Sequence, residues 1–205
     1  INGLKSECVM TSEIKPHAIE VLNHNFKEKI YPIDITKVKN VDIDDFDFLL
    51  AGFPCQPFSA SGKRHGFSDT RGTMFFEIER ILEAKKPKGF LLENVEGLVK
   101  HDLKDKNDPI GNTLKTILNI LINKLGYHTS WNVFDATNFG LPQKRKRIFI
   151  YGHKDFQPKV VFNEKIQLKP LADIFENNND FIDTEFTRKL LRHYGVEDLY
   201  GKSIK

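Results

Sequence analysis

The chain has 205 residues, of which 40% are hydrophobic and 29% charged, and its net charge is +3. These proportions are ordinary for a soluble globular protein, and the length predicts a sizeable core within one principal domain. No apolar run approaches the roughly 20 residues that cross a bilayer, and no basic segment followed by an apolar one opens the chain, so we expect a cytoplasmic protein with no membrane partner. The two cysteines, Cys8 and Cys55, suit a reducing compartment.

Short apolar runs alternate with amphipathic stretches along the chain, a pattern typical of a sheet covered by helices. We predict strands at residues 7–11, 46–51, 89–92, 128–133 and 147–151. We predict helices at residues 12–26, 73–86 and 112–125, the last ended by Gly126. The fold class is therefore predicted to be α/β, with a doubly wound, mostly parallel sheet. Beyond residue 152 the alternation fades, residues 177–179 indicate a loop or linker, and residues 180–205 favour one helix with a polar tail.

Three chemically capable side chains stand at the predicted carboxyl ends of strands: Glu13, Cys55 and Glu93. In open α/β sheets this edge is where ligands bind. A lone cysteine is most often a small buried hydrophobe. The prolines on either side of Cys55 and the nearby Gly52 instead indicate a stiff loop that a large ligand can approach.

A carboxylate directly after a buried run, as at Glu93, is either satisfied by local hydrogen bonds or kept partly protonated, as a general acid requires. Arg145 and Arg147 alternate before the last predicted strand, so their side chains are predicted to point the same way. Two guanidinium groups directed to one place suit a phosphate or a carbonyl oxygen.

Taken together, these segments resemble the motifs of the DNA cytosine-C5 methyltransferases. The run Gly-Phe-Pro-Cys-Gln-Pro-Phe-Ser at residues 52–59 is similar to the nucleophile motif of that family, residues 93–95 to its acid motif, and residues 143–147 to its Gln-x-Arg-x-Arg motif. Residues 62–76 also resemble the mobile catalytic loop and following helix of the bacterial restriction-modification members. The resemblance covers about residues 3–152, and three motifs in order are far more specific than any one of them.

The resemblance implies methyl transfer from S-adenosylmethionine to carbon 5 of a cytosine flipped out of duplex DNA, without a metal. Cys55 would add to carbon 6 as a thiolate. Glu93 would hold or protonate ring nitrogen 3 and accept from the exocyclic amine. Arg147, and secondarily Arg145, would bind the ring carbonyl or a nearby phosphate and favour the thiolate.

The same resemblance implies two sets of binding residues. For the methyl donor, Glu13 would accept from the ribose hydroxyls and Asp34 from the adenine amine. The expected donor contacts are Glu13, Ile14, Asp34, Ile35, Pro54 and Met74. The expected DNA contacts are Gln56, Ser59, Ser61, Lys63, Arg64, Arg71 and Asn94.

The family's first strand and its glycine-rich turn would precede residue 7, and its recognition domain would follow residue 152. We therefore expect a segment of a longer protein: residues 1–152 as a partial catalytic domain that lacks the first strand, and residues 153–205 as a linker with the start of the target-recognition region. The intact protein is expected to be a monomer. The sequence leaves open which DNA sequence is read and whether a cognate restriction endonuclease accompanies the protein.

Three alternatives stay open at this point. The chain could come from an RNA cytosine-5 methyltransferase of the same family, or from a truncated, non-catalytic nucleic-acid-binding member. A cysteine hydrolase would need a histidine base near Cys55, and the mid-chain candidates, His65 and His101, do not stand at predicted strand ends.

Overall fold

The computed structural model describes residues 5–26, 32–54, 74–159 and 166–167. The helices are α1 (Pro16–Asn25), α2 (Met74–Lys85) and α3 (Asn112–Asn119), and the strands are β1 (Phe48–Gly52), β2 (Gly89–Val95), β3 (His128–Asp135) and β4 (Lys146–His153). Short 3-10 turns lie at η1 (Ile35–Lys37), η2 (Asn40–Asp42), η3 (Glu96–Lys100) and η5 (Ala136–Asn138). A π-helical turn, η4 (Ile120–Lys124), continues α3.

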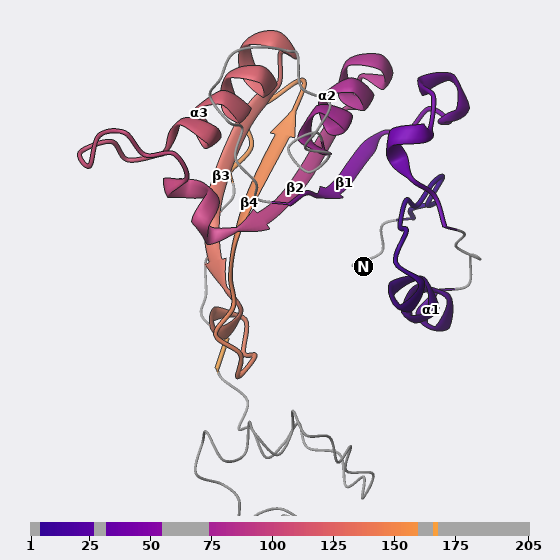
Figure 1. Cartoon of the computed structure of the whole chain (residues 1–205), viewed down its shortest axis with the longest axis horizontal. Coiled ribbons are helices and arrows are strands. Elements are labelled where there is room, and N and C mark those ends of the chain that lie inside the picture. Colours follow the sequence, from indigo (N-terminus) through magenta and orange to yellow (C-terminus); the bar gives the residue numbers. More distant parts are fainter. Residues whose placement is uncertain (1–4, 27–31, 55–73, 160–165, 168–205) are drawn as a thin grey trace, which may run out of the picture.

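The strands form one sheet in the order β1-β2-β4-β3, shown in Figure 1. β1 runs parallel to β2, whereas β4 runs antiparallel to both β2 and β3. Of the described strands, the last along the chain therefore fills a central position in the sheet. The α/β class is confirmed, but among the described strands the sheet is mixed and not mostly parallel.

The core lies between one face of the sheet and the helices α2 and α3 (Figure 1). Alternate residues of the central strands point into it and are almost fully buried: Phe90, Leu92, Ile148 and Ile150. They meet the apolar stripes of the two helices, of which Phe75, Leu82, Leu114 and Ile117 are nearly inaccessible to water. We call this the helix-covered face of the sheet.

The intervening residues of the same strands make up the opposite face, which no described helix covers. Leu91, Glu93, Phe149 and Tyr151 are only partly buried there, and Leu50 of β1 keeps 71% of its surface exposed. Because the side-chain period of a strand is two, residues 93 and 147 lie on this open face while residue 94 lies on the covered one.

The helical segments end within one residue of the predicted positions, but α1 begins at Pro16, four residues later than predicted. Pro16 occupies the first turn of α1, where its missing N–H costs nothing, and Gly126 stops the third helix with a positive φ of 69°. The end of that helix is wound differently, since Leu125 N donates to Ile120 O five residues back.

The strand predicted at residues 7–11 is wrong. This segment is irregular and forms no β-ladder with the described strands. A strand exists only through its hydrogen-bonded partner, and periodicity alone could not show that the partner is lacking. The predictions for residues 177–205 lie outside the described residues. No described helix has the length and apolar character needed to span a membrane.

Candidate active site at the open face of the sheet

An ion pair between Glu93 and Arg147 is the centre of the candidate site. In the antiparallel ladder Val95 stands opposite Arg147, and Glu93 stands opposite Phe149. Residues 93 and 147 are therefore diagonal neighbours on the open face. Arg147 Nε lies 2.7 Å from Glu93 Oε1, and Arg147 Nη1 donates to Lys146 O at 2.8 Å. The side chains keep 40% (Glu93) and 23% (Arg147) of their surface exposed, so a ligand can reach them.

The second carboxylate oxygen of Glu93 lies over the end of β1. Gly52 is the parallel-ladder partner of Glu93, and a Cβ added at Gly52 would stand 3.3 Å from Glu93 Oε2. A glycine at this position lets the carboxylate approach the backbone closely. The chain continues through Phe53 and Pro54 toward Cys55, which lies outside the described residues.

Asn94 does not lie where a DNA contact would need it, and this prediction is corrected. It is on the helix-covered face with 2% of its surface exposed. Its amide nitrogen donates to Phe53 O at 2.8 Å, and its side-chain oxygen accepts from Val95 N at 2.8 Å. Asn94 thus ties the end of β2 to the backbone just before Pro54. The alternation of buried residues along β2 could have indicated this burial.

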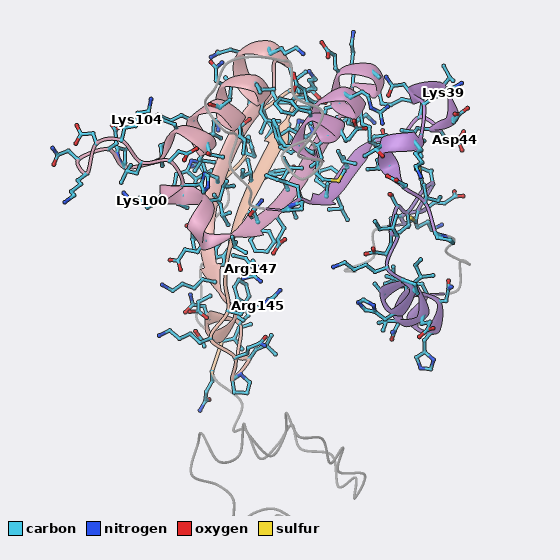
Figure 2. The ribbon with its side chains drawn as sticks, viewed as in Figure 1. Lys39, Asp44, Lys100, Lys104, Arg145 and Arg147 are labelled. Atoms are coloured by element: carbon cyan, nitrogen blue, oxygen red, sulfur yellow. The ribbon has the colours of Figure 1, made fainter. Side chains whose placement is uncertain are left out.

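Arg147 lies within β4, whereas Arg145 comes directly before that strand. Arg145 precedes β4, and its carbonyl accepts from Ala136 N at 3.0 Å while its N–H donates to Asp135 Oδ1 at 3.2 Å. Figure 2 shows Arg145 nearer than Arg147 to the turn that connects β3 with β4. The backbone N–H of Thr137, together with that of Arg145, lowers the pKa of Asp135 and favours the carboxylate that caps this turn.

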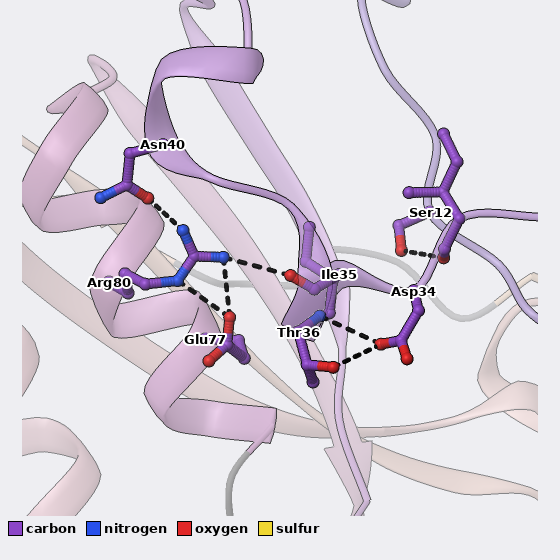
Figure 3. Close-up of polar contacts among 8 residues, drawn as sticks. Ser12, Asp34, Ile35, Thr36, Asn40, Glu77 and Arg80 are labelled. Carbon is purple, nitrogen blue, oxygen red and sulfur yellow. Dashed lines mark hydrogen bonds and ion pairs between the residues drawn. The ribbon is translucent and has the colours of Figure 1, made fainter.

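The predicted methyl-donor residues Glu13 and Asp34 come from two segments joined by hydrogen bonds (Figure 3). Ser12 Oγ donates to Ile33 O at 2.8 Å, and Ile33 N donates to Glu13 O at 2.9 Å. These two bonds hold Glu13 beside Ile33, the residue before Asp34. Sequence analysis did not anticipate the contribution of Ser12.

Both carboxylates are held ionised by local hydrogen bonds. Glu13 Oε1 accepts from Lys15 N at 2.9 Å and from Ile14 N at 2.8 Å, which lowers the pKa of Glu13. The hydroxyl of Thr36 at 2.7 Å and its backbone N–H at 3.1 Å lower the pKa of Asp34. Ionised carboxylates accept from hydroxyls and amines, which fits the ribose and adenine groups expected here.

The other predicted contacts of the methyl donor lie in several different elements. Ile14 is 60% exposed beside Glu13, whereas Ile35 begins η1. Pro54 is exposed at the end of the described segment, and Met74, the first residue of α2, packs partly buried against the core.

The remaining predictions for the site fall outside the described residues: Cys55, Gln56, Ser59, Ser61, Lys63, Arg64 and Arg71. Their roles stay predictions. Within the described ranges, no three histidine, cysteine, aspartate or glutamate side chains are grouped as a metal ion would require.

Comparisons with known proteins identify the family of the chain. The family model for C-5 cytosine-specific DNA methylases matches residues 1–198. The chain is 53% identical over 199 residues to the Type II methyltransferase M.NgoBV of Neisseria gonorrhoeae, covering 97% of this chain and 47% of the relative. It is equally similar to the Type II methyltransferase M.NlaIV of Neisseria lactamica. The chain therefore spans about half the length of the curated relatives that it matches.

Solved structures share the fold. The crystal structure of the S. pombe Dnmt2 methyltransferase superposes with a TM-score of 0.65 at 22% identity, over 92% of this chain and 59% of that chain. A DNMT2 structure from Spodoptera frugiperda gives a TM-score of 0.61, also at 22% identity, over 87% of this chain and 55% of that one. Because the family model extends over nearly the whole sequence, the chain belongs to the C-5 cytosine-specific DNA methylases.

Proposed function

We propose that the intact protein transfers a methyl group from S-adenosylmethionine to carbon 5 of a cytosine flipped out of duplex DNA. The observation that carries the proposal is the Glu93–Arg147 pair on the open face, beside the end of the strand that leads to Cys55. Family membership and the similarity to two proteins named as Type II methyltransferases support it.

Each residue of the proposed site has one task. The Cys55 thiolate adds to carbon 6 of the ring, which makes carbon 5 nucleophilic. Glu93 holds a proton at ring nitrogen 3 and accepts from the exocyclic amine, which selects cytosine. Arg147 holds Glu93 through Nε and is proposed to donate from its guanidinium to the ring carbonyl. S-adenosylmethionine supplies the methyl group, and Glu13 and Asp34 are the residues proposed to hold it.

The wider biological setting is part of the same proposal. Similarity to bacterial Type II methyltransferases supports a modification enzyme of a restriction-modification system. We propose further that it acts on DNA as a monomer in the bacterial cytoplasm. We also propose that residues 1–152 form part of the catalytic domain and that residues 153–205 lead into the target-recognition region. Gln56, Ser59, Ser61, Lys63, Arg64 and Arg71 are then DNA contacts.

The first prediction concerns the covalent step. Duplex DNA with 5-fluorocytosine at the target should become covalently attached to the intact protein when S-adenosylmethionine is present, because fluorine cannot leave carbon 5 as a proton does. Denaturing electrophoresis and mass spectrometry of the DNA-linked peptide should place the link at Cys55.

The control is the variant Cys55→Ser, which should form no stable adduct. An adduct that forms equally with Cys55→Ser, or no adduct on DNA that the wild type methylates, would contradict the mechanism. Methylation of tRNA without methylation of duplex DNA would identify the RNA-modifying alternative. Binding of DNA without methylation of either substrate would identify the non-catalytic alternative.

A further inference from the structure

Arg80 joins three separate parts of the chain through one guanidinium group (Figure 3). Its Nε and Nη2 lie 2.9 and 2.7 Å from Glu77 Oε2, one turn earlier on α2. Its Nη2 also donates to Ile35 O at 3.2 Å, and its Nη1 donates to Asn40 Oδ1. The fork is partly buried, with 29% of the Arg80 side chain exposed.

The two outer contacts fall on the segment that presents Asp34. Ile35 opens the η1 turn, in which Thr36 N donates to the Asp34 side chain, and Asn40 opens η2. Arg80 therefore holds both turns against α2. This helix begins at Met74, directly after the segment that contains Cys55 and the predicted catalytic loop.

Apolar packing gives this segment little other support. Between residues 5 and 47, the buried hydrophobic side chains in the described ranges are Ile19 and Ile43. The position of the Asp34 turn relative to the sheet therefore depends strongly on polar contacts. A second contact of this kind joins Lys85 Nζ to Asp45 Oδ1 at 3.0 Å, at the far end of α2.

We propose that Arg80 is a positioning residue for the methyl donor: it holds the 34–36 turn at the distance from α2 that donor binding needs. Glu77 orients the guanidinium, and Ile35 O and Asn40 Oδ1 accept its hydrogen bonds. This inference rests on the proposed function. Lysine cannot replace the group fully, since one ammonium lacks the planar fork that reaches three acceptors.

The second prediction tests this role in the intact protein. Arg80→Met should raise the Kd for S-adenosylhomocysteine, measured by calorimetry, by about tenfold, because the 34–36 turn loses the contact at Ile35 O and η2 loses the contact at Asn40. The KM for S-adenosylmethionine should rise by a similar factor with a smaller change in kcat. The Kd for duplex DNA should stay within about twofold, and Arg80→Lys should give an intermediate effect.

Lys85→Met is the matched control, because it breaks a contact between the same helix and the same segment without touching η1 or η2. It should leave the donor Kd within about twofold. Asn40→Ala removes one acceptor and keeps Arg80. It therefore tests the role of Arg80 if circular dichroism shows that Arg80→Met does not fold. It should weaken donor binding severalfold.

The outcomes separate this inference from the proposed function. A wild-type protein that binds no S-adenosylhomocysteine would refute the donor assignment and the inference with it. A wild type that binds, together with Arg80→Met and Asn40→Ala variants that bind equally well, would overturn the role of Arg80 alone. An equal loss in Lys85→Met would also overturn it, because the effect would then be a general loosening of the segment.

Discussion

At the scale of single residues, the site separates two neighbours on one strand by the face each one occupies. Glu93 points to the open face with Arg147, and Asn94 points to the covered face and holds Phe53 O. The first side chain is available for chemistry, whereas the second has both its polar groups occupied. Adjacent residues of one motif therefore have different tasks because the strand alternates.

The third prediction concerns Glu93. Glu93→Gln should slow methylation by about a hundredfold or more while duplex DNA still binds, because an amide cannot exchange a proton with ring nitrogen 3. Single-turnover methylation and an equilibrium DNA-binding assay on the intact protein measure the two effects separately.

Glu96→Gln is the matched control. Glu96 is also a carboxylate paired with a β4 cation, Lys146 Nζ at 3.2 Å, but half of its side chain is exposed on η3. This change should leave turnover within about twofold. Unchanged turnover in Glu93→Gln would remove Glu93 from the acid role.

The sequence predicted which residue types form the site, but not the contacts that each side chain makes. The motif Glu93-Asn94-Val95 indicated an acid, and the structure places that acid against Arg147. The same motif did not predict that the Asn94 amide would donate a hydrogen bond to Phe53 O, because that contact depends on how β1 and β2 align. Arg80 was missed because a helical arginine near a glutamate is usually a solvated surface pair.

At the scale of elements, the ring of Phe90 lies so close to the β4 backbone that a side chain at Gly152 would clash with it. Gly152 of β4 stands opposite Phe90 of β2, and a Cβ added at Gly152 would lie 2.2 Å from Phe90 Cζ. The ring has no room to move, since it is fully buried and packs edge-on against Tyr127 with centroids 5.0 Å apart. The glycine here is required by packing.

The fourth prediction follows from that contact. Gly152→Ala should lower the free energy of unfolding by about 1–3 kcal/mol, because the added methyl group overpacks the core. Urea denaturation of the intact protein, followed by circular dichroism, measures the loss.

Gly97→Ala is the comparison, since its Cβ would meet only Val95 Cγ2 at an ordinary 3.9 Å. It should change stability by about 0.5 kcal/mol or less. Equal stability of the two variants would show that Phe90 can move aside.

The sequence predicted elements better than it predicted their partners. Four of the five predicted strands are present, as β1 to β4, because apolar runs of this length between turn residues need burial in a sheet. Residues 7–11 have the same local pattern but no partner strand in the described chain. The antiparallel direction of β4 was also missed, because direction is set by the connection and is not written in the strand itself.

At the scale of the whole molecule, one buried phenol links stability to alkaline pH. Tyr127 is 1% exposed, and its hydroxyl donates to Pro87 O at 2.8 Å. Burial raises the pKa of Tyr127 to about 12 from an ordinary value of 10.0. A raised folded-state pKa means that stability is complete below about pH 10 and is lost as pH rises toward 12.

The fifth prediction uses Tyr127→Phe to isolate this loss. At pH 8 the variant should be less stable than the wild type by about 1 kcal/mol, because it lacks the hydrogen bond to Pro87 O. By pH 11 the wild type should lose about 1.4 kcal/mol that the variant keeps, so the order should reverse. Lys154 Nζ lies 3.8 Å from the centroid of the Tyr127 ring, and the variant keeps a ring for this contact.

Urea denaturation of both proteins at several values between pH 8 and pH 11 measures the difference. A stability gap that stays constant across this range would show that the Tyr127 hydroxyl reaches water in the folded protein.

The strand order also sets when this sheet can form during synthesis. β4 follows β2 and β3 along the chain, yet it separates β2 from β3 and brings Arg147 to Glu93. A nascent chain that ends before residue 146 holds β2 and β3 with no strand between them. Pairing with β4 closes a long loop, which is a slow step in folding. Glu93 therefore meets Arg147 only after β4 has been translated, and until then chaperones encounter β2 with the edge that β4 will occupy still open.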